Sequence, residues 1–205
     1  MTGDADRIID LYERHALAWV GDRGRQKVLF EKAWLDRFIA VAMPGASVLD
    51  LGCGSGRPLA AYLVGRGLRV HGVDSSPTMT SLFRENFPEQ ETTVGDMRQL
   101  SLGRRFAGVL AWDSFFHLSY DDQRRMFPIF RDHAAAGAPL LFTSGPRHGE
   151  AIGQFRGEAL YHASLAAEEY RALLADNGFT VLDARMEDPD CGGHSVWLAR
   201  RGEDR

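Results

Sequence analysis

The sequence has little cysteine, little lysine and no long apolar run. Its two cysteines, Cys53 and Cys191, form no C-x-x-C pair and no ligand set with the seven histidines. A structural zinc site is therefore not expected, while a disulfide between the two stays open. No segment approaches the ~18 apolar residues of a membrane span. The N-terminus is acidic and amphipathic rather than a secretory signal, which favours a cytoplasmic protein.

An excess of positive charge is also missing. The chain has 24 Lys and Arg against 28 Asp and Glu, which gives a net charge of -4. Nucleic acid is therefore not an expected partner, because it is bound by basic surfaces. With 205 residues and 44% hydrophobic composition, we expect one domain over residues 1–205. It divides into a helical cap at 1–44 and an α/β core at 45–205.

The first part of the chain predicts two helices before any strand. Apolar residues recur at helical spacing over residues 4–20 and again over 28–41, with a break at 21–24 and a stop at Pro44-Gly45. Helices in this position cover the open edge of an α/β sheet, where its ligand crevice lies.

The rest of the chain alternates strands with helices. Strands are predicted at 47–51, 69–74, 91–95, 106–112 and 138–143, and helices at 57–66, 77–86 and 121–136. The segment 144–164 is predicted to be a long functional loop because it is polar and rich in glycine. A helix at 165–177 and a hairpin of strands 179–186 and 194–200 close the chain. The pattern predicts a doubly wound, seven-stranded, mostly parallel sheet whose last strand is antiparallel.

The stretch VLDLGCGSG, from Val48 to Gly56, predicts a strand followed by a tight glycine turn. Such a turn lets a ligand approach the backbone, and its amide groups are expected to converge on the crevice. The glycines fall as G-x-G-x-G, since Arg57 occupies the sixth position of the dinucleotide pattern G-x-G-x-x-G. A plain strand-to-helix connection is the alternative interpretation.

Acidic residues follow the next two strands. Asp74 ends RVHGVD, where a carboxylate can accept both hydroxyls of a ribose. Asp96 follows ETTVG, and its neighbour Met97 suits a purine face. Each aspartate has the alternative role of a helix cap, as Asp74 does before Ser75-Ser76-Pro77.

The segments VLDLGCGSG, GVDSSPTM, VGDM and AWDSFFHL together resemble successive motifs of the class I S-adenosylmethionine-dependent methyltransferases of small-molecule type. The resemblance implies S-adenosylmethionine as cofactor, S-adenosylhomocysteine as product, and no metal. It assigns the methionine part of the cofactor to the turn, the ribose to Asp74 and the adenine to Asp96 and its surroundings. The implied cofactor residues are Tyr12, Asp50, Gly52, Cys53, Gly54, Gly56, Asp74, Ser75, Met79, Asp96, Met97, Ala111 and Trp112.

The methyl acceptor is expected to be a small molecule that is methylated at oxygen or nitrogen. His117 and His148 are candidate bases, because histidine titrates near neutral pH. A packed histidine and a solvated loop histidine are the respective alternatives. The predicted acceptor pocket contains Asp113, Phe116, Tyr161 and His162, which lie on the segments after strands 106–112 and 138–143.

Two other functions are weighed against this one. A nicotinamide-dependent oxidoreductase would need the full dinucleotide pattern and a catalytic Tyr/Lys set, which two lysines before the first strand, Lys27 and Lys32, hardly supply. A non-catalytic S-adenosylmethionine-binding regulatory protein would have a closed acceptor pocket. We expect a monomer or homodimer.

Overall fold

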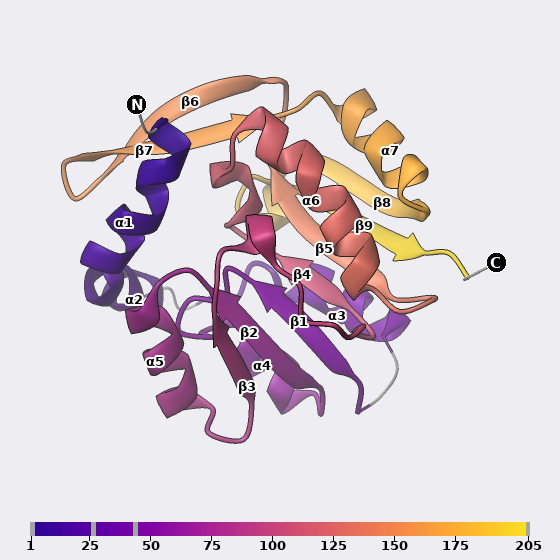
Figure 1. The fold of residues 1–205 in the computed structure, drawn as a ribbon, viewed down its shortest axis with the longest axis horizontal. Coiled ribbons are helices and arrows are strands. Elements are labelled where there is room, and N and C mark those ends of the chain that lie inside the picture. Colours follow the sequence, from indigo (N-terminus) through magenta and orange to yellow (C-terminus); the bar gives the residue numbers. More distant parts are fainter. Residues whose placement is uncertain (1–2, 26–27, 43–44, 204–205) are drawn as a thin grey trace.

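The computed structural model describes residues 3–25, 28–42 and 45–203. A seven-stranded sheet with the order β3-β2-β1-β4-β5-β9-β8 runs through the molecule (Figure 1). Its strands are β1 (Ser47–Leu51), β2 (Arg69–Asp74), β3 (Glu91–Val94), β4 (Val109–Ala111), β5 (Pro139–Ser144), β8 (Phe179–Asp188) and β9 (His194–Arg201). β9 is antiparallel to β5 and β8, and the other pairs are parallel. The predicted fold class is confirmed.

Helices cover both faces of the sheet because successive strand residues point to opposite sides. In β5, Leu140 and Phe142 pack with α6 (Tyr120–His133) and α7 (Ala167–Asp176). Leu141 between them packs on the other face with α3 (Lys32–Val41) and α4 (Leu59–Gly65). α5 (Pro77–Asn86) also covers this second face through Phe83. Each central strand is thus buried on both sides.

The N-terminal helices differ from the prediction. In place of one helix over 4–20, a 3-10 turn η1 (Asp4–Asp6) and α1 (Arg7–Arg14) are followed at His15 by a second helix, α2 (Ala16–Gly24). The predicted break at 21–24 is wrong, since α2 runs through it. His15 leaves the helical conformation while its Nε2 lies 2.6 Å from Glu158 Oε1. Pro44, the predicted stop of the next helix, lies outside the described residues.

The loop predicted at 144–164 is wrong as well. It forms an antiparallel hairpin of β6 (Gly149–Phe155) and β7 (Glu158–Ser164), separate from the main sheet. Tyr161 and Ala163 lie two residues apart on β7, hence on one face of the hairpin, and both are buried against Ile8 of α1. We call η1, α1, α2 and this hairpin the roof, which Figure 1 shows gathered along one edge of the sheet.

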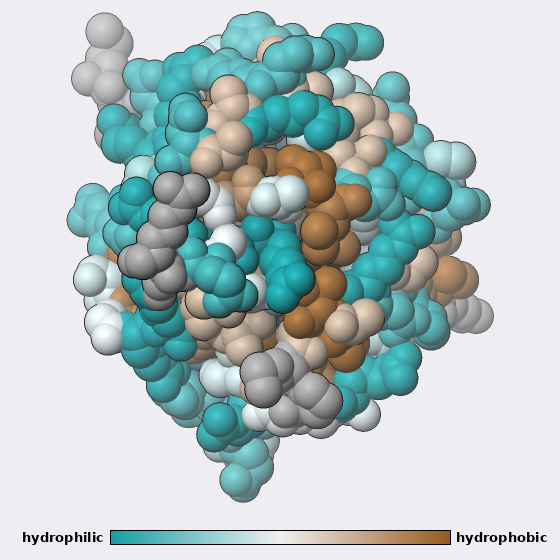
Figure 2. All heavy atoms as spheres, turned by 90° about the vertical axis from the view of Figure 1, so that its right-hand side faces the viewer, coloured by the Kyte–Doolittle hydropathy of each residue, from teal (hydrophilic) through white to brown (hydrophobic). Residues whose placement is uncertain are grey.

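The surface opposite the roof is mostly hydrophilic. Figure 2 looks onto the side of the molecule with β8 and α7 and shows a band of hydrophobic side chains bordered by hydrophilic ones. Leu182 on β8, the edge strand, is 47% exposed. None of the helices within the described ranges is long and apolar enough to cross a membrane.

Candidate functional site

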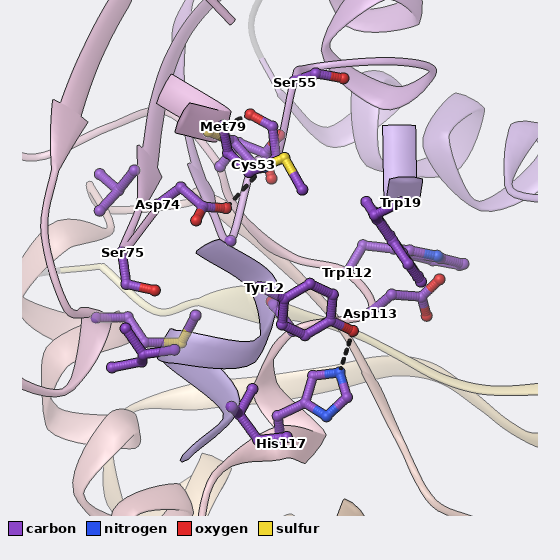
Figure 3. Close-up of a pocket in the computed structure, with 18 of the residues that line it drawn as sticks. Tyr12, Trp19, Cys53, Ser55, Asp74, Ser75, Met79, Trp112, Asp113 and His117 are labelled. Atoms are coloured by element: carbon purple, nitrogen blue, oxygen red, sulfur yellow. Dashed lines mark hydrogen bonds between the residues drawn. The ribbon is translucent and has the colours of Figure 1, made fainter. Parts of the chain in front are cut away.

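A cavity opens between the roof and the carboxyl ends of β1, β2 and β4 (Figure 3). The cavity has two regions of different chemistry. We call the region around the glycine turn and the strand-end acids the cofactor end, with Asp50, Gly52, Cys53, Gly54, Gly56, Asp74, Ser75, Met79, Asp96 and Met97. We call the region beneath the roof the acceptor end, with Tyr12, Trp19, Arg23, Trp112, Asp113 and His117.

The amides of the glycine turn do not converge on the cavity as predicted. The N–H groups of Gly52 and Cys53 both donate to the carbonyl of Val73, at 2.7 and 3.1 Å. Gly54 N–H donates to Asp74 Oδ2 at 2.9 Å, and Gly56 N–H donates to the carbonyl of Cys53 at 2.9 Å. These amides satisfy neighbouring backbone and carboxylate oxygens, so they are not available to an anion at the turn.

Two carboxyl groups, buried Asp50 and half-buried Asp74, face the cofactor end instead. Asp50 is 3% exposed at the end of β1, and burial together with the charge of Asp74 raises its pKa to about 7. Burial also raises the pKa of Asp74, against the opposing effect of the hydrogen bonds from Ser76 and Gly54 N–H. Because both groups lose water without gaining a cationic side chain, this end of the cavity stabilises a positively charged ligand.

Asp96 is engaged by an arginine that the sequence analysis did not single out. Arg98 donates from Nε and Nη2 to Asp96 Oδ2 at 2.9 and 2.7 Å. Its Nη1 donates to Asp6 Oδ1 in the roof at 2.7 Å. Asp96 Oδ1 accepts the backbone N–H of Arg98 at 2.9 Å and its Nε at 3.0 Å, so Arg98 engages both carboxylate oxygens. Arg98 thereby links the edge of the roof to the cofactor end.

A chain of hydrogen bonds fixes Tyr12 at the acceptor end. His117 Nδ1 is 2.8 Å from the carbonyl of Tyr161, which assigns the ring proton to Nδ1. Its Nε2 therefore accepts from the Tyr12 hydroxyl at 2.9 Å (Figure 3). Burial lowers the pKa of His117 to about 4 and raises the pKa of Tyr12. Both side chains are neutral at pH 7, and the Tyr12 oxygen keeps lone pairs for an N–H or O–H of a ligand.

Several predicted residues lie outside the lining of this cavity. Ala111 is buried within β4, and His148 stacks on Tyr120 with ring centroids 4.8 Å apart. Phe116 and His162 pack around His117, with ring centroids 4.8 Å from it in each case. Tyr161 donates its hydroxyl to Glu150 at 2.7 Å and meets the site through its carbonyl. Any contribution of these residues to ligand binding therefore passes through the residues that they contact.

Ser114, which follows the predicted strand 106–112, donates its hydroxyl to the Leu51 carbonyl at 2.7 Å and lines the cavity. Two other residues with clear contacts at the site, Arg98 and His194, were missed. Arg98 follows Asp96 by two positions, so a basic residue beside a strand-end acid is the signal that could have found it. His194 on β9 lies 3.0 Å from Asp113, and no local pattern connects residues so far apart in the sequence.

Both cysteines are free thiols, so the disulfide left open by the sequence does not form. In the described parts of the chain, no group of three or more His, Cys, Asp or Glu side chains could hold a metal ion. The lining of the cavity combines carboxylates, neutral hydrogen-bonding groups, aromatic walls and the arginines Arg23, Arg57 and Arg98.

Known proteins share this chain's features. Residues 48–137 match the family described as "Methyltransferase domain". A dTDP-3-amino-3,6-dideoxy-alpha-D-glucopyranose N,N-dimethyltransferase of Streptomyces fradiae is 39% identical over 75 residues, which are 36% of this chain and 29% of that protein. The chain spans 19% to 56% of the length of the curated relatives it matches.

Solved structures share the fold. The magnesium protoporphyrin IX methyltransferase of Synechocystis PCC 6803 with bound SAH superposes with a TM-score of 0.75 at 21% identity, covering 98% of this chain and 100% of that one. SAM-bound CalS10, an amino pentose methyltransferase from Micromonospora echinaspora, gives a TM-score of 0.71 at 21% identity, covering 90% and 96% of the two chains.

Proposed function

Through residues 48–137 the chain belongs to the class I S-adenosylmethionine-dependent methyltransferases, and from this premise we propose that it transfers a methyl group from S-adenosylmethionine to nitrogen or oxygen of a small molecule. The observation that carries the proposal is the cofactor end, where buried Asp50 and half-buried Asp74 face one cavity with Asp96. S-adenosylmethionine has a sulfonium and an ammonium against a single carboxylate, so its net charge complements these acids.

The hydrogen bonds of the glycine turn argue against a nicotinamide cofactor. A dinucleotide places its pyrophosphate on free amides at the start of the helix. Here the amides of Gly52, Cys53, Gly54 and Gly56 are used within the protein. A pyrophosphate would also lie beside the carboxyl groups of Asp50 and Asp74, which repel it.

The residues of the cofactor end suit S-adenosylmethionine in shape as well as charge. A side chain on Gly54 would fill space next to Met79, whose Sδ is 3.9 Å from such a Cβ, so glycine leaves this stretch of the turn open. We assign the methionine part of the cofactor to the turn and Asp50, the ribose to Asp74, and the base to Met79, Asp96 and Met97. Bound there, S-adenosylmethionine supplies a methyl group on a sulfonium that leaves readily as a thioether.

The acceptor end would then orient the nucleophile. Tyr12 accepts a hydrogen bond from the acceptor's N–H or O–H while its own proton is directed at His117 Nε2. Because the pKa of His117 is lowered to about 4, this histidine is a weak base. Its role is to hold the Tyr12 hydroxyl in place. Alignment of the acceptor with the methyl group supplies much of the rate, as in other proximity-driven reactions.

Calorimetric titration of the purified protein tests the proposal directly. We expect S-adenosylmethionine and S-adenosylhomocysteine to bind and NADH not to bind. Binding of NADH alone would overturn the proposal in favour of an oxidoreductase. Binding of S-adenosylmethionine without any methylated product across a metabolite library would favour the non-catalytic regulatory protein. Sedimentation of the same sample distinguishes the monomer from the homodimer.

Replacing Asp74 with alanine should weaken S-adenosylmethionine binding by about 1–3 kcal/mol, roughly 5- to 150-fold. The change removes hydrogen bonds to the ribose and also releases the N–H groups of Gly54 and Ser76, each 2.9 Å from the carboxylate. Asp183→Ala is the matched control, since Asp183 pairs with Arg37 on the surface. Equal affinities of Asp74→Ala and the unchanged protein would remove Asp74 from the cofactor site.

The relative from Streptomyces fradiae suggests a first acceptor to try. dTDP-3-amino-3,6-dideoxyglucose and its 3-hydroxyl counterpart differ only at the atom to be methylated, so mass spectrometry of the two products separates N- from O-methylation. Methylation of neither sugar nucleotide leaves the methyltransferase proposal standing and directs the search to other small molecules, because cofactor binding tests it separately.

Tyr12→Phe should lower turnover about 10- to 100-fold with little change in the Kd of S-adenosylmethionine. The hydroxyl is the only group lost, and the ring keeps its edge contact with Trp19 at 5.4 Å between centroids. The turnover of His117→Ala should be lowered by a similar factor, because Tyr12 is then free to rotate. His148→Ala is the control, since its ring stacks on Tyr120 outside the cavity lining. Full turnover in Tyr12→Phe would contradict the assignment, as would a loss in His148→Ala of equal size.

A further inference from the structure

Asp113 lies at the acceptor end in an unusual backbone conformation. It directly follows Trp112 at the end of β4, and its φ is +49°, in the left-handed region that favours glycine. Its N–H donates to Thr143 Oγ1 on the neighbouring strand at 2.9 Å, which fixes this conformation. Strained residues of this kind persist where the surrounding structure holds them, frequently at functional sites. Figure 3 shows the Asp113 side chain next to Trp112 and beneath Trp19.

His194 holds the carboxylate from the opposite side. Its Nε2 lies 3.3 Å from Asp113 Oδ2, with hydrogen-bonding geometry, and 3.0 Å from Oδ1. Its Nδ1 is 2.7 Å from the carbonyl of Cys191. Because both ring nitrogens face oxygen acceptors, both carry protons and the ring is an imidazolium. The hydrogen bond that His194 donates to Asp113 accordingly raises the pKa of His194, to about 9.

One oxygen of this ion pair lacks a hydrogen-bond donor. Asp113 Oδ1 is buried and accepts no hydrogen bond of acceptable geometry, in spite of its short distance to the imidazolium. The neighbouring Tyr12 and His117 are bonded to each other, and Arg23 is bonded to the buried Glu31. The Asp113 side chain as a whole is 24% exposed and lines the cavity, so a ligand can reach the carboxylate and supply a further donor.

The surroundings of Asp113 favour a cationic donor. Trp19 and Trp112 both line the acceptor end, and indole faces attract cations. A hydroxyl would satisfy Oδ1 by a hydrogen bond alone, whereas an ammonium adds charge attraction and a further interaction with the aromatic walls.

We propose that Asp113, held in position by His194, binds the positively charged amino group of the methyl acceptor, so that the acceptor is a primary or secondary amine. This inference rests on the proposed methyltransferase function. In it Asp113 touches the acceptor, and His194 is a positioning residue that acts through Asp113.

Before the transfer, the bound ammonium gives one proton to water, which leaves a lone pair on its nitrogen. The nitrogen forms a bond to the methyl carbon as the bond from carbon to sulfur breaks, and the electron pair of that bond neutralises the sulfur. The methylated nitrogen again carries a positive charge, so Asp113 faces a cation before and after the reaction.

Sinefungin and S-adenosylhomocysteine provide a test that needs no known acceptor. Sinefungin carries an amine-bearing carbon in place of the thioether sulfur, so its extra ammonium points toward the acceptor end. We compare the ratio of the two Kd values in the unchanged protein and in Asp113→Asn, because asparagine has a similar size and tolerates a positive φ. The preference for sinefungin should fall about tenfold in Asp113→Asn, with the Kd of S-adenosylhomocysteine changed less than about twofold.

The outcomes separate the two proposals. An unchanged protein that fails to bind S-adenosylhomocysteine contradicts the methyltransferase function itself. Normal binding with the same sinefungin preference in both proteins overturns only the role of Asp113. A parallel loss of both ligands in a folded Asp113→Asn protein would place Asp113 at the cofactor end and equally overturn the inference.

His194→Gln tests the positioning role by its pH profile. In the unchanged protein the imidazolium of His194 loses its proton as pH rises through about 9, so the sinefungin preference should fall more steeply from pH 8 to pH 10 than it does in His194→Gln. Equal profiles in the two proteins would overturn the role of His194. The titratable or charged groups facing this pair are Tyr12, Glu31, His117, His162 and Cys191.

These facing groups are present in both proteins, so they do not account for a difference between the two profiles. Tyr12 and Cys191 stay protonated over this range, since the pKa of Tyr12 is raised and that of Cys191 is raised to about 12. Burial lowers the pKa of His117 to about 4 and also lowers that of His162. Asp50 faces the amino acid part that both ligands share, so its titration cancels in the ratio.

Discussion

Gly52→Ala should lower the free energy of unfolding by about 2–5 kcal/mol relative to the unchanged protein. The variant should also bind S-adenosylhomocysteine on the order of 100-fold more weakly. Gly52 has φ +75°, and a Cβ placed there would lie 2.3 Å from the Cβ of Ser114. Ser114 cannot move freely, because its hydroxyl is bonded to the Leu51 carbonyl at 2.7 Å. The turn itself must therefore shift, and the cofactor end shifts with it. Urea denaturation and calorimetry measure the two effects.

Gly67→Ala is the matched control for this experiment. Gly67 also has a positive φ, +85°, but a Cβ there would meet no atom within 4 Å. We expect a loss of about 1–2 kcal/mol from the backbone conformation alone, with unchanged affinity for S-adenosylhomocysteine. Full affinity in Gly52→Ala, or an affinity loss of the same size in Gly67→Ala, would contradict a specific role for the Gly52 contact.

S-adenosylhomocysteine should bind on the order of 50-fold more weakly at pH 5 than at pH 7.5, because the pKa of Asp50 is raised to about 7. Only the ionised carboxylate attracts the ligand's ammonium, and each pH unit below the pKa lowers its fraction about tenfold. Binding near pH 6.5 should also release protons, which calorimetry in two buffers of different ionisation heat detects. An affinity independent of pH would show that Asp50 does not face the positive charge.

Asp50→Asn provides the control and a stability test. It should bind more weakly at pH 7.5 and lose most of the pH dependence, leaving the smaller contribution of Asp74, whose pKa is also raised. In the ligand-free protein Asp50 holds its proton up to about pH 7, whereas the unfolded chain releases it near pH 3.8. At Asp50 the native state thus binds more protons between these values, so this group lowers the free energy of unfolding as pH rises from about 4 to 7. The free energy of unfolding of Asp50→Asn, relative to that of the unchanged protein, should therefore rise over this range.

The main sheet was predictable because its signals are local. β1 and β2 are short apolar runs that end in an acid or a glycine turn, and α5 begins at the predicted Pro77, where Ser76 accepts the N–H of Met79 at 3.0 Å. Strand-end residues also meet at one edge of a parallel sheet, so the grouping of Asp74 and Asp96 in one cavity follows from their places in the sequence.

The secondary structure of the roof was less predictable, because contacts between segments distant in the sequence determine it. Gly149, Gly153 and Gly157 suggest a loop, yet the hairpin forms because Tyr161 and Ala163 gain a buried face against Ile8. His15 interrupts the first helix where its ring meets Glu158 from that hairpin.

Contacts between distant segments explain what was missed within the site. The pairing of Asp113 with His194 joins β4 to β9, which lie on either side of β5 in the sheet. The turn amides were misjudged for a related reason, since their acceptor, the Val73 carbonyl, belongs to the neighbouring strand. Such pairings depend on how strands are ordered, and a glycine pattern does not reveal it.

The roof begins almost at the first described residue, and Ala5, Ile8 and Tyr12 already line the cavity. The last described residues lie on the far side of the molecule, beyond the end of β9 (Figure 1). A fusion partner joined near Ala5 would consequently lie close to the cavity, and one joined near the end of β9 would not. Recombinant protein for ligand titrations is therefore best purified through its carboxyl terminus.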